Sequence, residues 1–251
     1  YHPNNAILIV AGDATPEEVR ALAEEHYGVI PANPDIEAHE TRVRPSEPPH
    51  TAARTVTYED PRVANPYVSI NYLAPERNAG DQEDAAALTL LAEILGGSGI
   101  TSILPRELQL EDERSLFVGA YYGGTNLDVT TFTLINMPLP GTSLEQAEAD
   151  LLAEIDEFLE EGIDPAQLER IRFQIEAARI YEEDDAAGLA RAYGTALTSG
   201  LTVADVQAWP DVLAAVTIED VMDAAREVFS QGVTTTGYLM QPAPEESPAD
   251  D

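Results

Sequence analysis

The residues whose types come nearest to a metal-binding spacing lie in the segment Leu22-Ala23-Glu24-Glu25-His26. A catalytic zinc helix carries two histidines four positions apart, so that both imidazoles face one metal, with a glutamate beside them as general base. Here Leu22 occupies the first ligand position, and one imidazole with one carboxylate falls short of the three protein ligands that catalytic zinc requires. We therefore interpret His26 as a helix-end residue, favoured there by the helix dipole, and predict that this chain binds no metal. The other histidines are expected in turns or in a linker: His2, His39 and His50.

A second candidate is the glycine-rich segment Gly96-Gly97-Ser98-Gly99. Glycines can cradle a phosphate, but a phosphate-binding loop follows a strand and continues into Gly-Lys-Ser or Gly-Lys-Thr. Here the segment follows a predicted helix, and Ser102 stands where a dinucleotide fingerprint has its third glycine. The pattern favours a helix C-terminus and a flexible turn over a nucleotide site.

The chain is strongly acidic, with a formal net charge of -33 at pH 7. Such a surface repels the phosphates of nucleic acid and anionic membranes, so we predict no nucleic-acid partner and attribute the charge to solubility or salt adaptation. The run Glu182-Glu183-Asp184-Asp185 lacks the alternating oxygens and central glycine of a calcium loop, and we interpret it as a solvated helix end.

Composition excludes several further chemistries. All 13 basic residues are arginine, so Schiff-base and P-loop lysines are absent. Without cysteine there is no disulfide and no thiolate catalysis. No Gly-x-Ser-x-Gly elbow is present. No apolar run approaches the length of about 18 residues that would predict a membrane span.

Hydrophobic periodicity and capping signals predict an α+β fold, a mainly antiparallel sheet with helices packed on one face. Thr15 before Pro16, and Ser143 before Gln146, are typical N-termini of helices. Strands are predicted at 6–10, 55–58, 67–73, 116–122, 129–136 and 233–240. Helices are predicted at 16–27, 81–95, 144–161, 165–183, 186–198, 202–209 and 217–229.

The stretch from Leu88 to Tyr122 combines an apolar helix, the glycine-rich crossing, a short helix with Arg106-Glu107-Leu108, and a strand. In this order it resembles the centre of the C-terminal domain of the M16 (pitrilysin/mitochondrial processing peptidase-like) zinc peptidases. The opening residues Tyr1–Asp13 resemble the strand that closes the N-terminal domain of that family. The resemblance implies the LuxS/MPP-like metallohydrolase fold. The His-x-x-Glu-His zinc motif of the family is absent from this chain.

This resemblance implies a division of the chain into four parts. Residues 1–30 are expected to finish the preceding M16 unit, 31–52 to form a linker, and 53–241 to form the C-terminal α+β domain. Residues 242–251 are acidic and proline-rich, and we expect a disordered tail. Because the chain opens on a turn and a strand, we also expect it to be part of a longer protein.

The resemblance further implies substrate contacts at Arg106 and at the loop of Gly96, Gly97, Ser98 and Gly99. In relatives an arginine on this helix and a tyrosine on the following strand contact the substrate backbone, but here the tyrosine position is Leu116. Ile103 replaces an upstream arginine, and Pro105 replaces a tyrosine. The alternative for Arg106 is a surface arginine paired with a neighbouring acid.

The chain is thus identified as the non-zinc-binding, C-terminal part of a bacterial M16 metallopeptidase, inactive alone and forming one wall of the peptide-degradation chamber. Implied partners are its own N-terminal domain, which would bind the zinc, a second M16 subunit or second copy, and a peptide substrate. Family resemblance alone places it in the periplasm. One alternative is a non-catalytic M16-like scaffold, and another is an unrelated acidic binding module.

Overall fold

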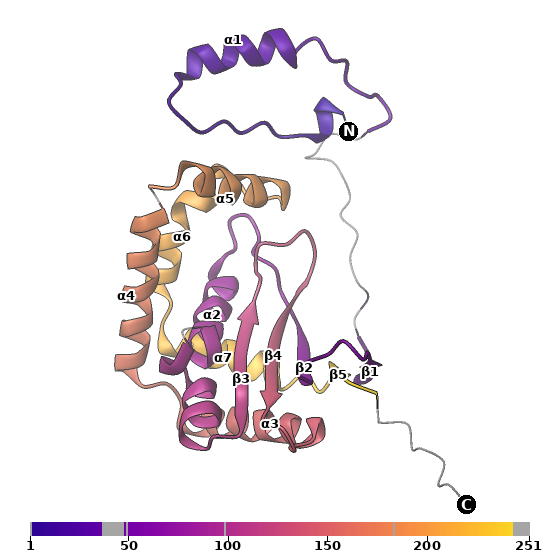
Figure 1. Cartoon of the computed structure of the whole chain (residues 1–251). Helices are drawn as coiled ribbons and strands as arrows, with labels where there is room; N and C mark the ends of the chain where they lie inside the picture. Colours follow the sequence, from indigo (N-terminus) through magenta and orange to yellow (C-terminus); the bar gives the residue numbers. More distant parts are fainter. Residues whose placement is uncertain (1, 37–47, 49, 98, 183, 243–251) are drawn as a thin grey trace, which may run out of the picture.

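The computed structural model describes residues 2–36, 48, 50–97, 99–182 and 184–242. It confirms the α+β class: one five-stranded sheet is covered by helices on one face, with α2 and α7 lying behind it in Figure 1. The strand order is β1-β5-β2-β4-β3, with β1 parallel to β5 and every other pair antiparallel. The strands are β1 (Arg54–Glu59), β2 (Tyr67–Ala74), β3 (Ser115–Tyr122), β4 (Thr130–Pro138) and β5 (Thr234–Met240).

The helices follow the predicted order along the chain. The α-helices are α1 (Pro16–His26), α2 (Glu83–Ala92), α3 (Leu144–Glu161), α4 (Pro165–Glu182), α5 (Ala186–Thr198), α6 (Val203–Ala215) and α7 (Ile218–Phe229). Short 3-10 or π-helical turns are η1 (Pro3–Asn5), η2 (Glu93–Gly97), η3 (Gly99–Thr101) and η4 (Pro105–Glu111). Thr15 and Ser143 cap α1 and α3 as predicted; the side chain of Gln146, however, donates to Asp150.

The core lies between the sheet and its helical layer. In β2 the alternate residues Val68, Ile70 and Tyr72 are buried, as the period of two predicts. The rings of Tyr72 and Phe132 both meet Phe229 edge to face, at centroid distances of 5.2 and 5.6 Å, which anchors α7 to β2 and β4. On the opposite face of the sheet several apolar side chains are exposed: Val56, Tyr58, Phe117 and Tyr121.

Two predicted elements differ from the structure. Residues 6–10 form no strand, because no strand of the described chain lies beside them to pair their backbone groups. The helix predicted to end before Pro210 continues as α6 to Ala215. A proline removes one helical hydrogen bond, but burial of Leu213 in the core stabilises the turn beyond it.

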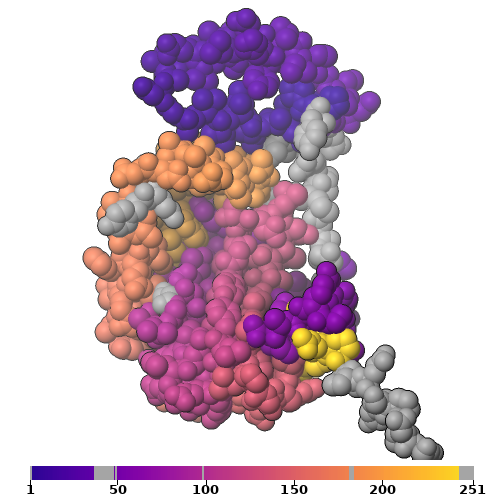
Figure 2. Space-filling view, viewed as in Figure 1, coloured from indigo at the N-terminus to yellow at the C-terminus, as the bar shows by residue number. Residues whose placement is uncertain are grey.

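The N-terminal segment forms a separate lobe beside α5, the indigo region of Figure 2. No residue of α1 is buried, and Leu22 in the helix and Tyr27, its C-cap, are each 55% exposed. An apolar helix face without a partner is typical of an element that packs on another surface. Parts of the predicted linker and tail, residues 37–47, 49 and 243–251, lie outside the described residues.

Candidate functional site

The glycine-rich segment Gly96–Gly99, called the crossing below, joins the end of η2 to the start of η3 and packs against the backbone of β3. A Cβ on Gly96 would lie 2.1 Å from the amide nitrogen of Ala120, so only glycine allows this approach. Gly99 has φ +62°, the left-handed region that favours glycine. The atoms nearest to a Cβ on Gly97 would be those of the Glu93 carboxyl group, at 2.6–2.7 Å. Close packing on β3 therefore explains the glycine at position 96, and the backbone conformation explains the glycine at position 99. Ser98 lies outside the described residues.

Two buried polar residues hold the crossing in place. The Ser102 hydroxyl donates to the carbonyl oxygen of Glu93 at 2.9 Å. The Gln167 side-chain amide, from the first turn of α4, donates to the carbonyl oxygens of Ile94 and Thr101 at 3.4 and 3.5 Å. Sequence reasoning missed Gln167. Its one available signal was a polar residue four positions before the buried Ile171, on the apolar stripe of the helix.

Arg106 lies in η4 just after Pro105, and its side chain is 45% exposed. Its Nε donates to Glu107 Oε1 at 2.8 Å, its Nη2 lies 2.6 Å from the same oxygen, and Glu111 lies 4.0 Å away. The alternative interpretation, a surface arginine paired with an acid, therefore describes its contacts. The same side chain also lines a cavity, where it is accessible to a ligand.

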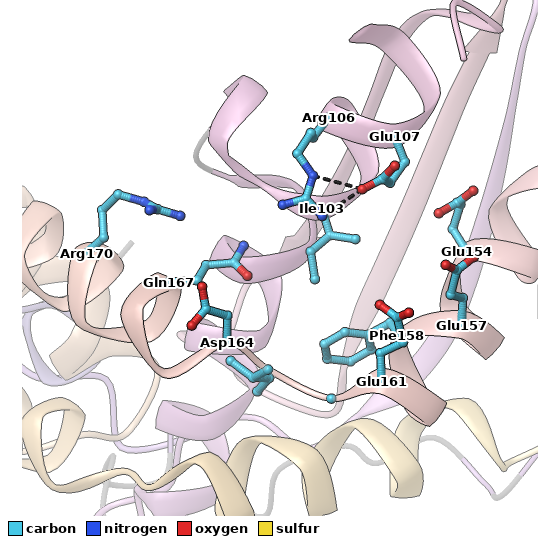
Figure 3. Close-up of a pocket in the computed structure, with 12 residues that line it drawn as sticks. Ile103, Arg106, Glu107, Glu154, Glu157, Phe158, Glu161, Asp164, Gln167 and Arg170 are labelled. Carbon is cyan, nitrogen blue, oxygen red and sulfur yellow. Dashed lines mark hydrogen bonds and ion pairs between the residues drawn. The ribbon is translucent and has the colours of Figure 1, made fainter. Parts of the chain in front are cut away.

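This cavity, of about 320 Å³, lies between η4, the end of α3 and the start of α4 (Figure 3). Its apolar floor is formed by Ile103, Phe158 and Ile163. Five carboxylates and two guanidinium groups surround the floor, a balance of two positive against five negative charges, or -3. The charged residues are Glu107, Glu154, Glu157, Glu161, Asp164, Arg106 and Arg170.

The charges of this cavity act on one another. Burial raises the pKa of Glu154, and repulsion from the carboxylates of Glu157, Glu107 and Asp112 raises it further, whereas Arg114 opposes them. The site therefore favours a proton or another positive charge at this carboxylate.

Leu116, at the position where the family resemblance implies a tyrosine, lies near the start of β3 and is 44% exposed. Gln109 of η4 binds the strand backbone on both sides of Phe117, the residue that follows it. Its Nε2 donates to the Leu116 carbonyl at 3.0 Å, and its Oε1 accepts from the Val118 amide at 3.2 Å. This position therefore presents an apolar side chain, and the amide of Gln109 binds the neighbouring backbone of the strand.

Metal ligands do not assemble within the described residues: no group of three His, Cys, Asp or Glu side chains could hold an ion there. His26 ends α1 with an exposed side chain. Of the acidic run, Asp185 caps α5 by accepting from the Ala187 amide at 3.1 Å, and Glu183 lies outside the described residues. The same part of the chain contains no helix long and apolar enough to cross a membrane.

Known proteins resemble the chain along most of its length. Residues 1–175 match the family described as Peptidase M16 inactive domain. The chain is 27% identical over 246 residues to the zinc protease PqqE of Helicobacter pylori, and the match covers 95% of the chain and 52% of PqqE. The chain thus spans about half the length of that relative.

Two solved structures show the same fold. A protease from Helicobacter pylori superimposes with a TM-score of 0.81 at 22% identity, covering 92% of this chain and 54% of that one. The first half of the periplasmic protease PqqL from Escherichia coli superimposes with a TM-score of 0.72 at 15% identity, covering 92% and 50%. These identities establish the architecture rather than a shared activity.

Proposed function

The chain belongs to the peptidase M16 inactive domain family, and from this premise we propose that it completes the peptide-degradation chamber of a zinc metallopeptidase whose catalytic zinc is bound by another domain. One observation carries the proposal. Nearly the whole chain matches only about half of a zinc protease, and His-x-x-Glu-His is absent from its sequence. Zinc ligands and the general base must then come from the remaining half.

In this proposal the chain supplies a wall and contacts, and its partner supplies the chemistry. The zinc-bearing domain would activate a water molecule, and the peptide would be held in extended form between the two halves. The exposed apolar side chains of Leu22 in α1 and of Tyr27 at its C-cap support docking of residues 1–30 onto that domain. A second M16 subunit, or a second copy, would close the assembly.

Arg106 and the Gly96–Gly99 loop are the proposed substrate contacts. The loop neighbours η4, and Arg106 lines the cavity between η4, α3 and α4. An arginine that exchanges its bond to Glu107 for a peptide carbonyl could hold substrate backbone, because guanidinium groups present several donors in one plane.

The proposed location is the periplasm, by analogy with PqqL of Escherichia coli, which is described as a periplasmic protease. An exported location is compatible with the absence of cysteine, because such a chain tolerates either redox state.

A second candidate is a scaffold subunit whose parent has no peptidase activity. The specific observation in its favour is the pairing of Arg106 with Glu107 together with Leu116 in the place of a tyrosine. Under this alternative the chain contributes assembly contacts alone.

The test is reconstitution of the chain with the other half of its protein. We expect the chain alone to bind no stoichiometric zinc and to cleave no peptide, and the mixture with zinc to hydrolyse a quenched fluorescent peptide library. Arg106→Ala is expected to raise the KM of the mixture. Arg62→Ala is the control, because Arg62 is an exposed arginine that also pairs with an acid but lies outside the cavity.

Association of the two halves, checked by size-exclusion chromatography, without hydrolysis would favour the scaffold. Zinc bound stoichiometrically by this chain alone would contradict the proposal, and His26 would be the first ligand to examine.

A further inference from the structure

We propose that the outer face of α4 is an interface on which a second copy of this chain docks, with the two α4 helices antiparallel across a two-fold axis at the level of Gln174. The inference deepens the proposed function, because it names the surface that a second copy would use. It depends on the exposure of Phe173, on the charge balance of α4, and on the order of the charges along this helix.

The outer face of α4 exposes a large apolar side chain beside an apolar groove. The helix runs along one side of the body next to α6 (Figure 1). Phe173 is 74% exposed, more than any other large apolar side chain in the described part of the chain. It borders a groove of about 650 Å³ between α4 and α6, whose lining includes Trp209, Pro210 and Leu213. Aromatic side chains at such a groove are typical of protein interfaces.

The charge of α4 identifies the kind of partner. The helix has three arginines and three glutamates, a net charge of zero, whereas α3 has the same length with eight acids and no arginine. Two copies of a chain of charge -33 repel each other over most of their surfaces, so a contact between them requires a balanced face. A basic partner would instead be attracted to the acidic surfaces elsewhere. The balance therefore favours a second copy as the occupant.

The order of the charges makes α4 complementary to itself. Glu169, Arg172, Glu176 and Arg179 all line the groove together with Phe173, so these side chains share one face of the helix. Positions 169 and 179 are each five residues from position 174, and positions 172 and 176 are each two residues from it. Each of these symmetric pairs joins a glutamate to an arginine.

An antiparallel second helix centred at position 174 therefore places Glu169 opposite the partner's Arg179, and Arg172 opposite the partner's Glu176. A two-fold axis repeats both pairs, as an isologous interface requires. Phe173 is one position from the centre, so the rings of both copies lie within the contact and leave water.

Within one copy the same charges are paired along the helix. Arg172 lies 2.7 Å from Glu169, and Arg179 lies 2.6 Å from Glu176. Exposed pairs of this kind contribute little to stability. In the dimer each carboxylate gains a second guanidinium from the other copy. Such complementary charges fix the register of an interface, while burial of an aromatic side chain supplies most of its affinity.

The experiment is sedimentation velocity on the full chain over a range of protein concentrations. A contact made by one helix from each copy is at the low end of interface sizes, so we expect a dissociation constant of about 10 μM to 1 mM. The dimer should become tighter as salt rises from about 0.1 to about 1 M, because the Debye length falls from about 10 to about 3 Å and the repulsion between the acidic copies is screened.

A first variant tests the apolar contact. Phe173→Ala is expected to weaken the dimer at least about tenfold, because the two-fold axis removes two buried rings. Folding should be unaffected, since the side chain is exposed in one copy. The control is Tyr58→Ala on β1, which removes an aromatic side chain that is 61% exposed and distant from α4 in the fold.

Charge reversals test the register. Arg179→Glu and Glu169→Arg should each weaken the dimer about three- to thirtyfold, because like charges then face each other at two places. The two changes together should restore it to within about threefold of the unmodified chain. Within one copy the double variant breaks both original pairs, so its recovery reports contact between copies. Arg226→Glu on α7 is the matched control, since Arg226 also lies 2.6 Å from an acid three positions before it.

A chain that stays monomeric at about 1 mM in about 1 M salt would overturn the interface, and the other half of the protein would become the candidate occupant. A dimer that Phe173→Ala leaves unchanged, or that the control variants weaken equally, would also overturn it. So would a double reversal without recovery.

These results are separate from the proposed peptidase. Dimers that depend on Phe173, together with reconstituted halves that cleave no peptide, support the interface and contradict the peptidase. Hydrolysis by the reconstituted halves, together with a strictly monomeric chain, supports the peptidase and contradicts the interface.

Discussion

At the scale of single residues, Gly96 and Gly97 are adjacent and identical, but their surroundings are not. The position of Gly96 is closed by the backbone of β3 at Gly119 and Ala120. The atoms nearest to the position of a Cβ on Gly97 belong instead to the side-chain carboxyl group of Glu93. A backbone atom cannot rotate away, so the two glycines should differ sharply in their tolerance of a methyl group.

Gly96→Ala is therefore predicted to lower the free energy of unfolding by about 1–3 kcal/mol, a fall in Tm of about 2–12 °C for a chain of this size. Gly97→Ala is the matched control and should lower it by less than Gly96→Ala does, because a side chain moves aside at lower cost than a strand backbone. Thermal unfolding followed by circular dichroism measures both. Equal losses in the two variants would show that β3 does not constrain the crossing.

At the scale of elements, α6 is tied to the loop between β2 and α2 by a buried network around Asp205. Its Oδ1 accepts from the Gly80 amide at 2.9 Å, and its Oδ2 accepts from the Thr202 amide at 2.7 Å. Arg77 donates to the Asp205 carbonyl at 2.8 Å and lies 3.9 Å from the centroid of the Trp209 ring. Burial lowers the pKa of Arg77 to about 10, so it remains charged at neutral pH. The network holds the start of α6 on the core ahead of its internal proline.

Asp205→Ala is predicted to destabilise the chain by about 1–3 kcal/mol at pH 7, because it leaves the Gly80 and Thr202 donors without an acceptor. The hydrogen bond from the Thr202 hydroxyl, and then the amides of Gly80 and Thr202 and the charge of Arg77, lower the pKa of Asp205. Its stabilisation is thus complete above the unfolded pKa of about 3.9 and is lost as pH falls through the lower folded pKa.

The difference in Tm between Asp205→Ala and the unmodified chain should therefore shrink as pH falls below about 4. Asp211→Ala, at an exposed position of the same helix, is the control and should show no such change. A difference that stays constant from pH 7 to pH 3 would contradict the assignment of the ionised carboxylate as acceptor.

At the scale of the whole molecule, the body with the sheet and the lobe with α1 differ in how they are held. The body has a continuous core from β2 to α7. The lobe has no buried residue in α1, and its apolar side chains at Ile7, Leu8 and Val10 are about half exposed. Little apolar surface is therefore removed from water between the two, and the body should be stable without the lobe.

Removal of residues 1–52 is predicted to change the Tm of the remaining body by less than about 2 °C. The control is a fragment that begins after β1, at Asp60. That fragment loses the parallel pairing of β1 with β5 along six residue pairs and should be markedly less stable. Thermal unfolding of both fragments tests the expected boundary near residue 53, and an unfolded 53–242 fragment would contradict it.

The sequence by itself determined the elements whose signals are local. Alternation in β2, the caps at Thr15 and Ser143, and the helix and strand order around Arg106 all appear in the structure close to their predicted limits. These features depend on side-chain periodicity and on hydrogen bonds between residues three or four positions apart, which a sequence displays directly. The order of elements also carried the family resemblance, which the match of residues 1–175 confirms.

Only the tertiary structure decided the features that depend on distant partners. A strand at 6–10 needs a neighbour, and the described chain provides none. The continuation of α6 beyond Pro210 depends on core packing of Leu213. The cavity joins Arg106 to carboxylates about 50 residues away on α3 and to Gln167 on α4. Burial and charge at such a site arise from contacts between elements that are distant in sequence. The sequence pattern therefore pointed to Arg106 but could not identify the residues that surround it in the cavity.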